Sequence, residues 1–155
     1  MSEDPGTFEP RPPSPTIEEL DEGSRALIAE ALEVAQALGL PENIRELSDL
    51  FTERRAHWFG IPEAERPHPD DFITAVSALV AQRLALTLAL DWVMYTDEDG
   101  TVLALMAPAE QVHADQNLYI FPLEGIAARW PEDGEGEVLA YYEGVVEHVR
   151  EQLRS

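Results

Sequence analysis

The histidines are the first residues to test for chemistry, because imidazole binds zinc and transfers protons near neutral pH. The chain has four of them: His57, His68, His113 and His148. No two form H-x-x-x-H and none stands in H-E-x-x-H, so the sequence predicts no helical zinc site. His113, Glu110 and Asp115 could make a weak metal site, but a polar loop explains the same letters. We therefore expect no metal and no cofactor.

The remaining motif tests are also negative. Asp97-Glu98-Asp99-Gly100 resembles part of a calcium loop, but the matching first and twelfth positions are Tyr95 and Met106, which carry no carboxylate. A phosphate-binding P-loop needs lysine and a thiol nucleophile needs cysteine, and the sequence has neither. G-x-G-x-x-G and G-x-S-x-G are absent as well. The sequence thus predicts no catalytic residue.

Two arginines and one aspartate are more informative. Arg83 falls on the predicted inner stripe of a long helix, where a guanidinium needs a well-placed partner. It can extend its head to the rim, pair internally with Asp91 at the junction of two apolar segments, or line an anion pocket. Between Arg83 and Arg129 there is no cation but there are seven acidic residues, so this region should attract a cationic partner.

Several aromatic residues are predicted to be exposed: Trp58, Tyr119, Trp130 and Tyr141. Aromatic and arginine side chains are the usual energetic anchors of protein interfaces. The candidate binding residues are therefore Trp58, Arg83, Asp91, Tyr119, Arg129 and Trp130.

Three helices are expected in the first ninety residues. Thr16-Ile17-Glu18-Glu19 fits a capping box, so a helix should begin there and end at Gly39, with Ser24 as a possible second cap. Apolar residues at helical spacing predict a second helix over 41–60. A third, with a wide apolar face, should run from 70 to about 90; Gln82 and Arg83 in its middle argue against a membrane span.

The spacing of apolar residues along the chain changes after Asp91. Residues 92–96 and 101–106 are rich in β-branched and aromatic types, and Gly100 suits the turn between them, which predicts a hairpin. A third strand is expected over 118–121, a short helix from Pro122 to Trp130, and a last helix with a one-sided apolar stripe from Val138 to Leu153. The predicted class is α+β, with three helices, a small three-stranded, mainly antiparallel sheet and two helices, in the order α-α-α-β-β-β-α-α.

Composition sets the class of partner. The 155 residues carry a net charge of −21, which argues against direct binding to nucleic acid or to an anionic membrane. All ten basic residues are arginine, which is typical of a high-GC bacterial genome, although salt adaptation also explains the acidity. Residues 1–15 hold five prolines and are expected to form a disordered acidic leader before one domain over 16–155. The N-terminus has no secretion signal pattern, so we expect a cytoplasmic protein.

A resemblance supports the fold. Trp92-Val93, the turn at 97–100, Phe121-Pro122-Leu123 and Ala128-Arg129-Trp130 look like a family of small bacterial proteins of unknown function, common in actinobacteria. That family places a long helix before a W-V…D-E-x-G hairpin and follows it with an F-P-L strand-to-helix corner. The resemblance covers about residues 70–150 and implies a fold and a lineage but no reaction.

Three functions remain open at this point. The leading hypothesis is a non-enzymatic module (an adaptor, a chaperone-like or an immunity-like protein) that binds another, basic protein. The second is a small enzyme with a pocket of carboxylates and arginine or His57 between the long helix and the sheet. The third is an anionic mimic of DNA.

Overall fold

The computed structural model describes residues 15–107, 117–131 and 136–154 and confirms the α+β class. These residues form five α-helices, one short 3-10 turn at Glu63–Glu65 and one antiparallel sheet of four strands in the order β1-β2-β3-β4. The strands are β1 (Thr16–Glu19), β2 (Asp91–Asp97), β3 (Gly100–Ala107) and β4 (Leu118–Ile120). The helices are α1 (Glu22–Ala37), α2 (Ile44–Gly60), α3 (Asp70–Leu88), α4 (Pro122–Ala127) and α5 (Val138–Arg154).

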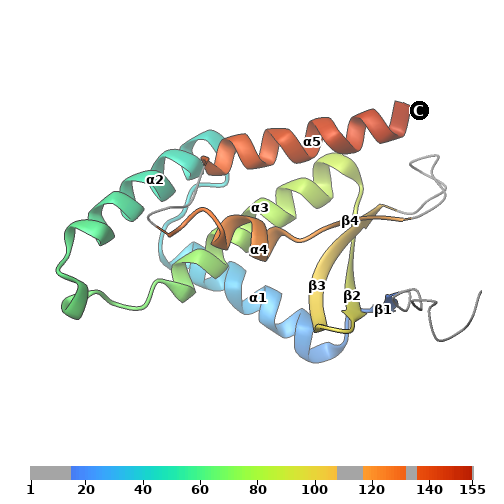
Figure 1. The fold of residues 1–155 in the computed structure, drawn as a ribbon, viewed down its shortest axis with the longest axis horizontal. Coiled ribbons are helices and arrows are strands. Elements are labelled where there is room, and N and C mark those ends of the chain that lie inside the picture. The colour runs from blue at the N-terminus through green and yellow to red at the C-terminus, as the bar shows by residue number, and fades with distance from the viewer. Residues whose placement is uncertain (1–14, 108–116, 132–135, 155) are drawn as a thin grey trace, which may run out of the picture.

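The helices lie on one side of the sheet, with α3 in the middle of the molecule (Figure 1). α3 contacts each of the other four helices, which explains why it is apolar on nearly all sides. Nine of its residues are buried, among them Val76, Val80 and Leu84, which have no exposed surface. By length and composition α3 could cross a membrane, but a core helix passes the same test.

The start of the chain differs from the prediction. Thr16–Glu19 is a strand that pairs antiparallel with β2, with Thr16 opposite Thr96, and the sheet therefore has four strands rather than three. Helix α1 begins only at Glu22, capped by Asp21, whose carboxylate accepts a hydrogen bond of 2.7 Å from the Ser24 amide. The capping-box prediction was wrong because the free edge of β2 satisfies the backbone of these residues instead. Ser24 is buried against Met94 and caps nothing.

The other elements agree with the sequence. α2, α3, the β2–β3 hairpin and α5 lie where the apolar periods place them, and α4 has proline in its first turn. Gly39 has φ +69° and ends α1 in the left-handed conformation, as predicted. The proline-rich leader and the loop that holds Glu110, His113 and Asp115 fall almost wholly outside the described residues.

Helix α5 receives a cap from a distant helix. The Leu139 amide, in the first turn of α5, donates a 2.9 Å hydrogen bond to the Ser48 hydroxyl of α2, and Ser48 is 1% exposed. The first amides of a helix have no partner within it, and a buried hydroxyl of another helix supplies the acceptor here. Ser48 therefore joins two elements that are 91 residues apart in sequence.

Replacing Ser48 with alanine is expected to lower the free energy of unfolding by about 1–2 kcal/mol, because the Leu139 amide loses its acceptor. Urea denaturation followed by circular dichroism measures this change. Asp49→Ala, at the exposed neighbouring position, is the control and should change stability by less than about 0.5 kcal/mol. Equal stabilities of the two variants would contradict the assignment of this cap.

Candidate functional site

The candidate site is an open groove between the β4–α4 segment and α5, with a volume of about 690 Å³. Residues of both walls line it: Tyr119, Ile120, Phe121, Glu124, Gly125, Ala128 and Arg129 on one side, and Ala140, Tyr141, Gly144, Val145 and His148 on the other. In Figure 1, α5 runs above α4 and β4, so the groove opens between segments that are adjacent in the fold. We call it the α4–α5 groove.

Gly125 makes the close approach of the two walls possible. A Cβ atom at this position would lie 2.4 Å from Cε1 and Cζ of Tyr141, well inside van der Waals contact. Glycine costs helix stability, so its place inside α4 is explained by the ring that packs on it. Pro122, at the start of α4, presets the first turn of this short helix. The α4 backbone thus forms the surface on which Tyr141 lies.

Arg129 packs on the same ring. Its guanidinium carbon is 4.7 Å from the centre of the Tyr141 ring, and its Nη1 donates a 2.8 Å hydrogen bond to the Gly125 carbonyl oxygen. Its Nε atom is buried, with no hydrogen-bond partner among the described residues. The cation is therefore used inside the fold, where it stacks on an aromatic ring and binds the backbone of α4.

The pKa of the Tyr141 phenol is raised above its ordinary value of 10.0, mainly because burial disfavours the phenolate. The Arg129 charge opposes this shift, and the Glu124 carboxylate adds to it. Since the folded pKa exceeds the unfolded one, ionisation of the Tyr141 phenol destabilises the fold. The stability that depends on the neutral phenol is complete below pH 10 and is lost as the pH rises through the folded pKa.

Replacing Gly125 with alanine is expected to push the Tyr141 ring out of its place and to return the pKa of its phenol toward 10, because the ring gains solvent. Absorbance at 295 nm during an alkaline titration measures this pKa. Tyr141→Phe identifies the transition that belongs to this phenol. An unchanged titration curve in Gly125→Ala would show that Tyr141 does not pack on α4.

Aromatic residues of the sheet continue the groove. Tyr119 lies edge-on to Tyr95 of β2, with ring centres 4.9 Å apart, and Tyr95 lies edge-on to Phe121 at 5.1 Å. Tyr95 and Tyr119 come from strands on either side of β3, and the fully buried Ala104 is small enough to let the rings meet across it. Asn117 donates a 3.2 Å hydrogen bond to the Tyr119 hydroxyl. Tyr119 is therefore fixed in direction although it is only half-buried.

Of the six candidate residues, the structure brings only Tyr119 and Arg129 to this groove. Trp130 was predicted to be exposed, which is wrong: it is 6% exposed, and its ring centre lies 5.4 Å from Phe51, 5.6 Å from Trp58 and 5.7 Å from Phe72. Trp58 is half-buried in the same cluster, and its indole N–H donates to the Pro67 carbonyl oxygen at 2.7 Å. Both tryptophans thus pack the interior between α2, α3 and α4.

Arg83 and Asp91 are both exposed, which overturns the inner-stripe prediction for Arg83. Arg83 shares the solvent face of α3 with Gln82 and Leu86, and its Nη2 lies 3.5 Å from the Glu42 carbonyl oxygen. The predicted apolar face of α3 is buried, but Arg83 lies beside that face, on a side of the second half of the helix that is exposed to solvent. Asp91 begins β2 opposite Met106.

The pocket expected between the long helix and the sheet exists, but its chemistry differs from the prediction. The hollow there, of about 190 Å³, is lined by apolar, serine and threonine side chains, and neither Arg83, His57 nor a carboxylate reaches it. The acid–base pocket proposed at this place was wrong. Within the described part of the chain, no three His, Asp or Glu side chains gather closely enough to hold a metal ion.

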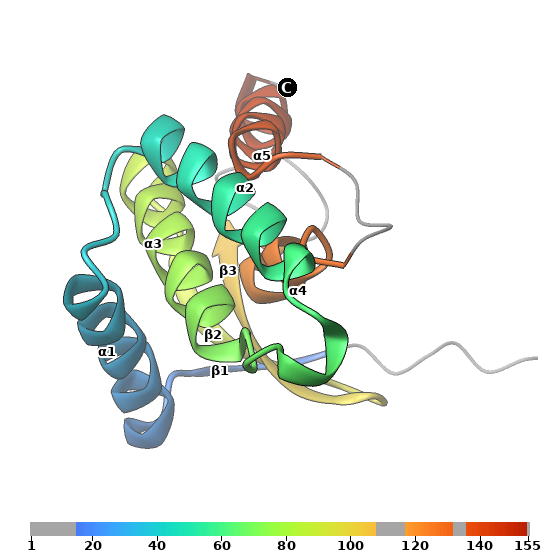
Figure 2. The same ribbon diagram turned by 90° about the vertical axis from the view of Figure 1, so that its left-hand side faces the viewer.

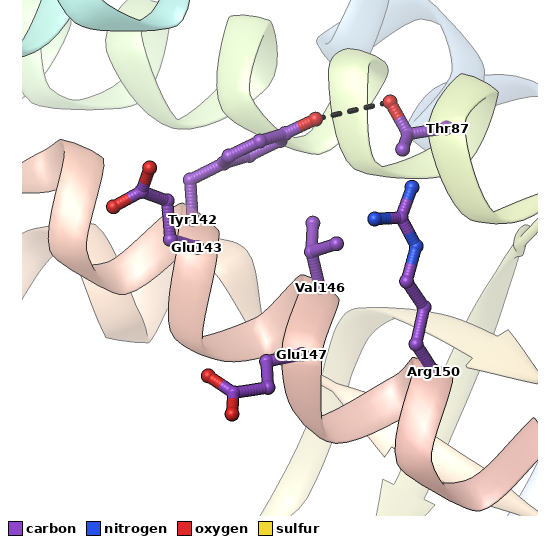
Figure 3. Close-up of a pocket in the computed structure, with 6 residues that line it drawn as sticks. All are labelled: Thr87, Tyr142, Glu143, Val146, Glu147 and Arg150. Atoms are coloured by element: carbon purple, nitrogen blue, oxygen red, sulfur yellow. Dashed lines mark hydrogen bonds between the residues drawn. The ribbon is translucent and has the colours of Figure 1, made fainter.

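A second polar hollow lies where α5 crosses the end of α3 (Figure 3). The Thr87 and Tyr142 hydroxyls are 3.0 Å apart, and Arg150 extends toward them from α5. The Glu143 and Glu147 carboxylates point away from this pair in Figure 3. Neither of these two glutamates is thus aimed at a hydroxyl, and the hydrogen bond joins α3 to α5.

Sequence reasoning missed Phe121, Gly125 and Gly144 as groove residues. Gly125 and Gly144 both carry a signal in the sequence, since a glycine inside a helix indicates a close approach, but only at Gly125 does a neighbouring ring lie where a Cβ atom would be.

Comparison with known protein families agrees with the expectation of an uncharacterised family. A family model described as "Domain of unknown function (DUF3806)" matches residues 63–142, slightly more than half of the chain. The matched part runs from the 3-10 turn through α3, the hairpin, β4 and α4 into the first turn of α5, so it includes the β4–α4 wall of the groove but only Ala140 and Tyr141 of the α5 wall. No curated protein and no solved structure matches the chain.

Proposed function

The chain belongs to the DUF3806 family, and from this premise we propose that it is a non-enzymatic module that binds a basic segment of another protein in the α4–α5 groove. One observation carries the proposal: Tyr119 and Tyr141, both expected from the sequence to anchor an interface, line the same groove. Tyrosine supplies a large, rigid contact area at low entropic cost and is frequent among interface anchors.

The charge of the protein favours a cationic partner. The net charge of −21 attracts arginine and lysine from a distance, and the exposed Glu124 lies on the groove wall to pair with one of them. Arginine or lysine also stacks on tyrosine faces. The Arg129 guanidinium keeps its positive charge while it is stacked on Tyr141 and bonded to Gly125, so we expect the basic side chains of the partner to pair with Glu124 and to avoid Arg129.

The groove is open and has room for side chains of a peptide segment. A volume of about 690 Å³ holds a few side chains, and clefts of about 300–1,000 Å³ are typical of ligand sites. The small residues Ala128, Ala140 and Gly144 keep the floor open between the aromatic walls.

The test is selection from a random peptide display library at low salt, followed by titration of one selected peptide. We expect peptides that contain arginine or lysine next to an aromatic residue, and at least tenfold weaker binding at 500 mM than at 50 mM NaCl, because salt screens exposed charges. The charge-reversed peptide, with glutamate at each basic position, is the control. Selection of acidic peptides, equal binding of the reversed peptide, or selection of no peptide would each contradict the proposal.

A further inference from the structure

The hollow between α1, α3 and the inner face of the sheet has a chemistry that the proposed function does not use. Its walls are Ile28 of α1, Trp92 of β2, Leu103 of β3 and Leu123 of α4, all of them half-buried. Its volume is about 190 Å³. We call it the apolar pocket. In Figure 2, α1 and α3 lie side by side with the strands next to them, which is where this pocket opens.

Small residues create the space. Ala31 of α1 and Ala78 of α3 are 8% and 6% exposed and line the pocket, as does the fully buried Ser77. Short side chains let the two helices approach, but they do not reach Trp92 and Leu103 on the sheet. The exposed Leu27 and Thr74 stand at the edge of this space, so the pocket is open to solvent on one side.

The lining excludes a charged ligand. Thr74 and Ser77 are its only residues with polar side chains apart from the Trp92 indole. The Ser77 hydroxyl already donates a 2.7 Å hydrogen bond to the Ile73 carbonyl oxygen. An ionised group placed here would lose its hydration and gain no counter-charge. The pocket therefore suits a neutral, mostly apolar molecule with at most one polar atom near Thr74.

The dimensions and the wall indicate the class of ligand. An apolar cavity of about 150 Å³ takes up benzene, and this pocket is slightly larger. Trp92 offers an aromatic surface for edge-on or offset stacking. Leu27, which is 62% exposed, stands in the lining, so an entering molecule would cover apolar surface that now faces water. We propose that the apolar pocket binds a small neutral aromatic molecule of one or two fused rings.

The test uses the full chain labelled with ¹⁵N, with toluene and indole as probes. Both should bind saturably at one site, and the indole N–H signal of Trp92 should shift, while those of Trp58 and Trp130 in their separate cluster stay in place. Benzoate and benzylammonium, which have the same ring with a charge, should bind at least tenfold more weakly than toluene. Absence of saturable binding, equal binding of the charged compounds, or shifts confined to Trp58 and Trp130 would overturn the proposal.

Substitutions in the lining test where the ligand binds. Ala31→Leu places a larger side chain in it, and Ala29→Leu, at an exposed position of the same helix outside the lining, is the matched control. We expect at least tenfold weaker toluene binding in Ala31→Leu and unchanged binding in Ala29→Leu. Thr74→Phe, at an exposed lining position, blocks the entrance and decides the question if Ala31→Leu does not fold. Undiminished binding in a folded, filled variant would overturn the proposal. Peptide binding in the α4–α5 groove is measured separately, and its outcome does not enter this test.

Discussion

Replacing Trp130 with alanine is expected to lower the free energy of unfolding by about 3–5 kcal/mol, the range for truncating a large aromatic side chain in a core. Trp130 is 6% exposed and lies edge-on to Phe51, Trp58 and Phe72. Its loss would leave three aromatic rings around a cavity that the helices cannot close. The backbone is held there as well, because Arg55 donates from Nε to the Trp130 carbonyl oxygen at 2.7 Å and from Nη2 to that of Pro131.

Thermal and urea denaturation measure this change, and the melting temperature should fall by about 10 °C. Leu86→Ala, a truncation at a position that is 75% exposed, is the control and should cost less than about 0.5 kcal/mol. Trp130→Phe should cost less than Trp130→Ala, since it keeps a ring and removes an indole N–H that is buried without a partner among the described residues. A loss of stability no larger than that of Leu86→Ala would contradict the burial of Trp130 in the core.

Replacing Gly144 with phenylalanine is expected to weaken peptide binding in the α4–α5 groove by about 100-fold, or about 2.7 kcal/mol. Gly144 lines the groove, and a Cβ atom there meets nothing within 4 Å. The new ring would therefore occupy the part of the groove in which we propose that the peptide binds. The fold should be stabilised slightly, because glycine inside a helix such as α5 is unfavourable. Loss of binding and gain of stability are thus expected together.

Fluorescence anisotropy with a labelled peptide measures the affinity, and thermal denaturation measures the stability. Gly60→Phe is the matched control: Gly60 ends α2, a Cβ atom there also meets nothing within 4 Å, and the residue does not line the groove. Its affinity should equal that of the unmodified protein. If both variants bind alike, the partner does not occupy the α4–α5 groove.

Local sequence patterns were enough to predict most of the helices and strands. The apolar period of 138–153 and the turn at Gly100 depend on contacts between near neighbours, so the sequence predicted α5 and the hairpin. The same reasoning failed at Thr16–Glu19, where a good capping box competes with a strand. The free edge of β2, about 75 residues away, decides in favour of the strand, and no local pattern reports that edge.

The candidate site, too, was determined partly by the sequence and partly by the tertiary structure. The types of residue that can anchor a partner, such as Tyr119 and Tyr141, and the acidity that favours a basic one, are properties of the sequence alone. Packing decided which aromatic residues face solvent. Trp130 is buried because it packs against the aromatic side chains of α2. Arg129 turns inward onto Tyr141 because Gly125 leaves room for the ring. Periodicity tells which face of a helix is apolar, whereas burial depends on whether another element covers that face. That covering arises from contacts between residues far apart in the chain, and only the folded structure contains them.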